Sequence, residues 1–83
     1  MRFSVPRFFF NLHDDLSVID QEGLELASVE AAIAKAISSA REMACAEVLE
    51  GHLNLSHSIE VVDEGRTVVE IIRFSDVLSI EDT

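Results

Sequence analysis

Apolar and polar side chains alternate between residues 7 and 13, which is the first regular pattern in the chain. Phe8, Phe10 and Leu12 fall on one face, and the other face carries Arg7, Phe9, Asn11 and His13. The period of two predicts a strand. Asp14-Asp15 then favours a turn, residues 16–20 a returning strand, and Gly23 a second turn with positive φ.

A helical period follows, and it predicts one long helix from about Ser28 to Glu50. Ser28 is suited to cap its first turn, Glu30 to interact with the positive end of its dipole, and Gly51 to end it. The apolar positions recur every three or four residues and form one stripe, namely Val29, Ala32, Ile33, Ala36, Ile37, Ala40, Met43 and Ala44.

Residues 58–63 and 67–74 predict two further strands joined by Glu64-Gly65-Arg66. We expect Gly65 to supply the positive φ that a tight hairpin needs. The preceding residues, 51–58, are expected to form a loop, with the side chains of Leu53 and Leu55 buried beneath that loop.

The order of these elements predicts an α+β fold, β-β-α-β-β, with a small antiparallel sheet and one long helix packed on one face. Eighty-three residues allow a single domain, 1–83. Within it, residues 1–6 read as an N-terminal extension and 76–83 as a loosely ordered tail.

The predicted strands are apolar on both faces, although a single helix can cover only one. In the last strand, Val69 and Ile71 fall on one face, with Val68, Ile72 and Phe74 on the other; Phe9 likewise opposes its neighbours. Strands of this kind are usually buried on both faces. We therefore expect a homo-oligomer, most simply a dimer, with interface residues Phe9, Val69 and Ile71. The alternative is that β-branched residues merely suit strands.

The net charge of −10, from 16 acidic against 6 basic residues, limits the partners. Nucleic acid and anionic membranes attract basic surfaces, so neither is expected as a ligand. The 48% apolar content argues against disorder, which goes with low hydrophobicity.

One cysteine, Cys45, permits no intrachain disulfide, and the start of the chain lacks the apolar core of a signal peptide because Pro6 and Arg7 interrupt it. No stretch is long enough to cross a bilayer. These features predict a cytoplasmic protein.

Five segments in order resemble an uncharacterised family of small proteins, common in alphaproteobacteria and known as a domain of unknown function. The segments are Pro6-Arg7-Phe8-Phe9-Phe10, Asp20-Gln21-Glu22-Gly23-Leu24-Glu25-Leu26, Glu30-Ala31-Ala32, Val62-Asp63-Glu64-Gly65 and Phe74-Ser75-Asp76. The chain departs from the family in the residues before Pro6 and at Asn11, where the family often has His or Asp. The resemblance implies a small stand-alone cytoplasmic protein and brings no catalytic residues.

A looser likeness, confined to the first strand and the Glu-Ala-Ala helix, is to HicB-type antitoxins. Such proteins bind and neutralise a basic toxin, so this likeness implies a basic protein partner. An acidic chain would suit that role.

Few side chains form a pattern typical of chemistry. His13, His52 and His57 are the weak candidates for a metal site, with Asp14 and Asp15 nearby in sequence, but their spacing matches no known ligand motif. The acids between residues 14 and 22 lack the order of a calcium loop.

Two single residues are candidates for reactivity or for an ion pair. Cys45 is expected on the outer side of the helix, near Glu42 and Glu47, where a thiol is not activated. Glu47 is expected to pair with Arg41, Arg66 or Arg73, or to lie at the edge of the core.

No catalytic residue and no cofactor is therefore predicted. The expected function is a non-enzymatic, acidic, homo-oligomeric protein-interaction module. The alternatives are an antitoxin-like binder of a basic protein and a small metal-binding protein that uses histidine and carboxylate ligands.

Overall fold

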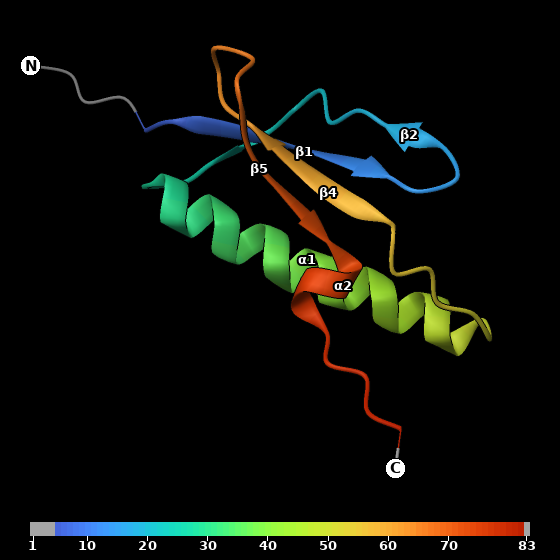
Figure 1. Cartoon of the computed structure of the whole chain (residues 1–83). Coiled ribbons are helices and arrows are strands. Elements are labelled where there is room, and N and C mark those ends of the chain that lie inside the picture. The colour runs from blue at the N-terminus through green and yellow to red at the C-terminus, as the bar shows by residue number, and fades with distance from the viewer. Residues whose placement is uncertain (1–4, 83) are drawn as a thin grey trace, which may run out of the picture.

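A computed structural model describes residues 5–82 and contains an antiparallel sheet with a long helix along one face (Figure 1). The strands are β1 (Arg7–His13), β2 (Ser17–Val18), β3 (Leu24–Glu25), β4 (Ser58–Val62) and β5 (Val68–Arg73). Their order is β2-β1-β4-β5. Strands β2 and β3 lie along the same edge of β1, where β2 pairs with its last residues and β3 with its first. This confirms the α+β class, with β3 as a strand that was not predicted.

The returning strand predicted for residues 16–20 is only two residues long. Asp20 interrupts it, because its carboxylate accepts the Phe10 amide at 3.1 Å in place of a strand carbonyl. The same carboxylate accepts the amides of Glu22 and Gly23. Gly23 has the predicted positive φ of 70°, and a Cβ there would lie 2.8 Å from the Phe8 carbonyl oxygen. A glycine is therefore required where this turn passes β1.

Helix α1 (Val29–Leu49) confirms the predicted helix and its caps. Ser28 accepts the Ala31 amide at 3.1 Å, and Gly51 follows the last turn with a φ of 93°. The stripe of alanines lies against the sheet, because Ala32, Ala36, Ala40 and Ala44 are all buried. Their small side chains let the helix axis approach the strands closely. Val29, at the start of the stripe, is 40% exposed.

The inner face of the sheet, which packs on α1, forms the core with these alanines. Its buried side chains are Phe8, Ile59, Val61 and Ile72, and Phe10 and Leu12 pack against them. Phe74, which directly follows β5, is fully buried in the same cluster. Leu53 also packs there as predicted, whereas Leu55 is 38% exposed.

The β4–β5 hairpin differs from the prediction at its turn. Gly65 does not have a positive φ; Arg66 does, at 64°. The turn is held instead by Asp63, whose carboxylate accepts the Thr67 amide and whose carbonyl accepts the Arg66 amide. The side chain of Asp63 therefore stabilises a turn in which a non-glycine residue takes the left-handed conformation.

A β-bulge in β5 also reverses the faces on which Val68 and Val69 lie. Val61 pairs with Glu70, but the next residue, Val62, pairs with Val68, so Val69 has no partner. Val69 packs against the core, and Val68 is 47% exposed. The prediction that Val69 shares a face with Ile71 is therefore wrong, and Val68 takes that place.

Strand β5 ends at Arg73 rather than at Phe74, and a short helix, α2 (Phe74–Val77), follows it. The tail predicted from residue 76 begins with ordered structure, because Arg41 donates to the Val77 carbonyl and Leu78 packs on the core. Residues 1–4 of the predicted extension lie outside the described residues. No helix within residues 5–82 is both long and apolar enough to span a bilayer.

Candidate functional site

The outer face of the sheet is the side opposite α1, and no helix of residues 5–82 lies on it (Figure 1). The strand register arranges its side chains in three rows, each crossing β1, β4 and β5. The rows are Phe9–Val62–Val68, Asn11–Glu60–Ile71 and His13–Ser58–Arg73. The face thus grades from an apolar row near the β4–β5 turn to a polar row at the opposite end.

The apolar end of the outer face is accessible and hollowed. Val68 and Ile71 are 47% and 43% exposed, and Ile19, next to Phe9, is 59% exposed. A cavity of about 420 Å³ lies among Phe9, Ile19 and Val62. This volume is within the range of ligand or side-chain pockets.

Several of the polar groups around this cavity are engaged within the fold. Asn11 donates to Glu60 and accepts the Asp20 amide, and the carboxylate of Glu64 accepts the Arg7 amide. Burial opposes ionisation of Asp20, but the amides of Gly23, Phe10 and Glu22 and the charge of Arg7 outweigh it and lower its pKa. The cavity therefore combines three apolar side chains with polar ones, among them Gln21 and Arg66.

The free edge of β5 has its outward amides bonded to side chains. Glu70 accepts the amide of Ile71 at 3.2 Å, and Asp76 accepts the amide of Arg73 at 2.9 Å. Carboxylates placed on an edge in this way hinder the addition of another strand. The outer face is therefore better suited than this edge to bind a partner.

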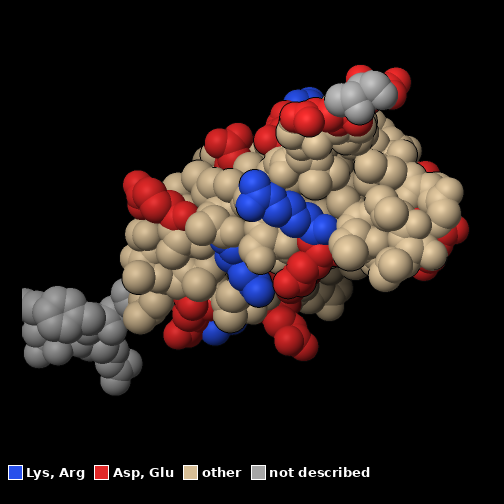
Figure 2. Space-filling view, turned by 90° about the horizontal axis from the view of Figure 1, so that it is seen from below, with Lys and Arg blue, Asp and Glu red and all other residues tan. Residues whose placement is uncertain are grey.

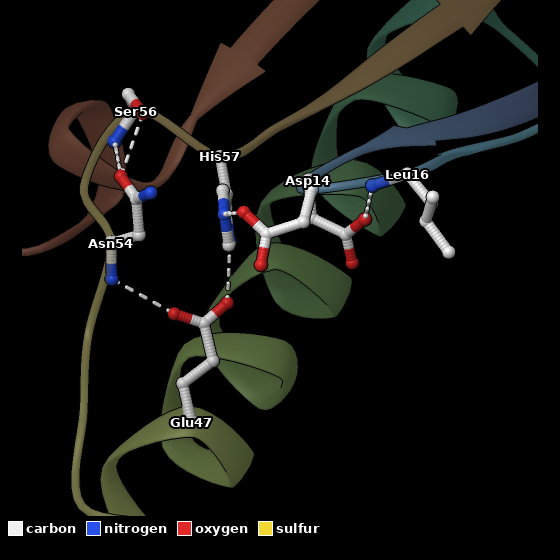
Figure 3. Close-up of polar contacts among 7 residues, drawn as sticks. Asp14, Leu16, Glu47, Asn54, Ser56 and His57 are labelled. Atoms are coloured by element: carbon white, nitrogen blue, oxygen red, sulfur yellow. Dashed lines mark hydrogen bonds and ion pairs between the residues drawn. The ribbon is translucent and has the colours of Figure 1, made fainter.

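A second cluster of polar side chains lies where the end of α1 meets the sheet (Figure 3). Glu47 of α1 binds His57 through one carboxylate oxygen, at 2.7 Å from Nδ1, and accepts the Asn54 amide with the other. Asp15, from the β1–β2 turn, lies 3.7 Å from His57 Nε2. Glu47 thus lies partly buried at the edge of the core, as one of the two predicted alternatives has it, and it pairs with His57 rather than with an arginine.

The pKa values of this pair shift in opposite directions. Burial of the His57 ring favours the neutral form, but the hydrogen bond and charge of Glu47, with the charges of Asp15 and Asp14, raise its pKa above the ordinary value. Burial disfavours ionised Glu47, yet the Asn54 amide and His57 lower its pKa. The cluster therefore favours an ion pair that ties α1 to the loop before β4.

The three histidines do not assemble into a metal centre. His13 lies near Ser17 and Glu60, His57 is buried against Glu47, and His52 is exposed in the loop after α1. Glu47 and Asp15 approach opposite nitrogens of the His57 ring, so they do not converge on one point. Within residues 5–82, no three His, Cys, Asp or Glu side chains are arranged to hold a metal ion.

The helix side of the molecule shows a different surface (Figure 2). Basic side chains lie in the middle of this face with acidic side chains directly beside them, and further acidic side chains lie around its outline. Cys45 is exposed there, as predicted, on a shallow groove that it shares with Ala34 and Ser38. Ile37, Arg41 and Glu42 also line this groove, so it combines small, apolar and charged side chains.

Two residues of the outer face were missed by the sequence analysis. Val62 was assigned to a strand without a face, and Val68 was assigned to the inner face. The position of Val62 could have been predicted, because it is the last apolar residue before the turn. The exposure of Val68 could not, because the bulge that causes it does not show in the alternation of apolar and polar residues.

Comparison with known proteins identifies one family. Residues 7–75 match the family described as Domain of unknown function (DUF6894). No curated protein and no solved structure shows significant similarity to the chain.

Proposed function

The chain belongs to the DUF6894 family of unknown function, and we propose that it is a small, non-enzymatic interaction module that binds a second copy of itself through the outer face of the sheet. The observation that carries this proposal is the row Phe9–Val62–Val68, three apolar side chains on neighbouring strands of a face that bears no helix in the described part of the chain. Exposed apolar surface of this kind is typical of an interface.

The net charge of the chain limits where two copies can meet. Two chains of net charge −10 repel one another, so they can meet most readily where positive charge is concentrated. Of the five Lys and Arg in residues 5–82, three lie on or beside the outer face: Arg7, Arg66 and Arg73. The same face also carries Glu60 at its centre, and Arg7 is paired with Glu25, so basic and acidic side chains are mixed on it.

The apolar area supports a weak, reversible dimer. Five partly exposed apolar side chains per copy would remove on the order of 500 Å² from water, which at about 25 cal/mol per Å² contributes on the order of 10 kcal/mol. Association costs about 4–15 kcal/mol in lost freedom of motion. The two estimates are similar in size, so we expect the dissociation constant of the dimer to be micromolar or higher.

Val68→Glu tests the proposal directly. It places a charge in the apolar row, and because Val68 is 47% exposed the variant should fold normally. Val48→Glu, on α1 and 57% exposed, is the matched control. We expect sedimentation velocity to show monomeric Val68→Glu at concentrations where the wild type and Val48→Glu are dimeric. Equal association of all three proteins would refute the proposal, and so would stoichiometric capture of a different, basic protein by a monomeric wild type.

A further inference from the structure

The imidazole of His57 is held by two helices, so its orientation is fixed. Its Nδ1 lies 2.7 Å from the carboxylate of Glu47 on α1 (Figure 3). The ring also meets the Phe74 ring of α2 edge-on, with the ring centroids 5.7 Å apart, and the His57 carbonyl accepts the Phe74 amide at 2.8 Å. Because His57 is only 7% exposed, the ring has little room to turn away from these partners.

The other ring nitrogen, Nε2, is buried and has no hydrogen-bond partner within residues 5–82. Asp15 Oδ1, in the β1–β2 turn, lies 3.7 Å from it, whereas a hydrogen bond of this kind spans about 2.7–3.2 Å. A carboxylate that came about 0.5–1 Å closer would therefore accept from a protonated Nε2. A buried polar atom without a partner costs free energy, so a movement that pairs Nε2 is favoured.

The protonation state of Nε2 decides whether Asp15 is attracted. Glu47 keeps a proton on Nδ1 in both the charged and the neutral ring, so Nε2 is the nitrogen that gains or loses its proton. When protonated, Nε2 is a charged donor and attracts the Asp15 carboxylate. When it is not, its lone pair faces a carboxylate oxygen, and two acceptors repel each other.

The β1–β2 turn, residues 14–16, is built so that it can approach or leave His57. The side chain of Asp15 is 93% exposed and Leu16 is 76% exposed, so the turn has little packing of its own. The Asp14 carboxylate accepts the Leu16 amide at 2.8 Å, which maintains the shape of the turn without tying it to the core. Strand β2, which follows, is only two residues long. Segments of this kind open at low free-energy cost.

We propose that His57 is a pH-dependent switch for the β1–β2 turn: the protonated ring binds Asp15 through Nε2 and holds the turn, and the neutral ring releases it. The switch would control how firmly β2 covers the edge of β1, where Val18 pairs with Leu12. It goes beyond the proposed function and does not require a second copy of the chain.

The charged groups around His57 set the direction of the switch. Glu47 faces the ring from α1, Asp15 and Asp14 face it from the turn, and α2 presents only the uncharged Phe74 ring. His52, in the loop after α1, acts on Glu47. Burial of the ring opposes protonation, but these three carboxylates outweigh it and raise the pKa of His57 above its ordinary value of 6.5. The turn is therefore held at low pH and released as the pH rises through the folded-state pKa.

Asp15→Ala tests the switch, and because Asp15 is so exposed the variant should fold normally. Glu30→Ala makes the same change in net charge, from −10 to −9, at the other end of α1, about 25 Å away along the helix. In an NMR titration of the His57 ring, we expect Asp15→Ala to lower the midpoint by about 0.3–1 pH unit. Glu30→Ala should leave it unchanged, because salt screens charges at that distance. Equal midpoints in the wild type and both variants would overturn the proposal.

The backbone of the turn gives a second measurement that a merely structural histidine would not affect. In the wild type, the ¹⁵N heteronuclear NOE of the Leu16 amide should fall as the pH rises through the His57 midpoint. In Asp15→Ala it should be low at every pH, and in Glu30→Ala it should follow the wild type. A Leu16 NOE that stays constant across the wild-type titration would overturn the proposal. So would ring ¹⁵N shifts that place the proton of neutral His57 on Nε2.

Discussion

The inner face of the sheet is closed by the α1 alanines, whereas the outer face leaves comparable side chains half exposed. Ile72 and Ile71 are neighbours on β5, yet Ile72 is 7% exposed and Ile71 43%. The inner face is apolar along its whole length, whereas the outer face is apolar only in part and also carries Asn11, Glu60 and Arg73. The difference arises because the chain has one long helix and two faces to cover. The comparison shows that the inner face forms the core, whereas the outer face is partly exposed in residues 5–82.

The largest expected effect comes from removing the same side chain on either face. Ile72→Ala should destabilise the protein by about 2–5 kcal/mol, because it leaves a cavity in the core. Ile71→Ala should lower stability by less than about 1 kcal/mol and should weaken self-association instead. Urea unfolding of both variants at low protein concentration measures the first effect, and sedimentation measures the second. Similar unfolding midpoints for the two variants would mean that the inner and outer faces contribute equally to the stability of the fold, which contradicts this prediction.

A smaller effect is expected at His57, which joins the end of α1 to the sheet. Its raised pKa means that protonated His57 stabilises the fold fully below its ordinary value of 6.5, and that this contribution is lost as the pH rises through the folded-state pKa. Glu47, with a lowered pKa, contributes above its ordinary value of 4.5 and loses its effect as the pH falls through its folded-state pKa. The pair therefore contributes most between these two values.

His57→Gln should lower stability at pH 6 by about 1–3 kcal/mol, the usual range for a hydrogen bond to a charged group. It should also flatten the loss of stability between pH 6 and 9 in urea unfolding. His52→Gln is the control, because His52 is exposed on the same loop. A wild-type stability that rises over this pH range would contradict the assignment of an ion pair.

The smallest effect is expected outside both faces, at Cys45. This residue is exposed on the helix side, away from the core and from the outer face. Cys45→Ser should therefore change stability by less than about 0.5 kcal/mol and leave the dimer unaltered. Loss of association in this variant, measured under reducing conditions, would mean that the helix side rather than the sheet forms the interface.

Much of the fold follows from local patterns in the sequence. The helix and its caps were predicted because Ser28, the apolar stripe and Gly51 each act within a few residues of one another. Strand β1 was predicted with its observed bounds, because its alternation is equally local. Such features depend on neighbouring residues alone and are visible in a single sequence.

The features that were not predicted depend on contacts between distant segments. Asp20 shortens the returning strand by bonding to the Phe10 amide, ten residues away. The bulge at Val69 is set by the register with β4 and exchanges the exposed valine. Glu47 reaches His57 only because the chain after α1 turns back beside it. These interactions carry no sequence period, so the partner of each group becomes visible only in three dimensions.

Of the three predicted interface residues, the fold places two, Phe9 and Ile71, on the outer face and replaces the third. The prediction of self-association itself rests on the two-sided apolar character of the strands and is the central claim of this account. Its most direct test is the mass of the wild-type protein as a function of concentration.

Sedimentation equilibrium at physiological salt, from about ten micromolar to one millimolar, measures that mass in solution. We predict that it rises from 9.2 kDa toward twice that value as concentration increases. A mass that stays at 9.2 kDa up to one millimolar would contradict the account, because the outer face would then bind no second copy.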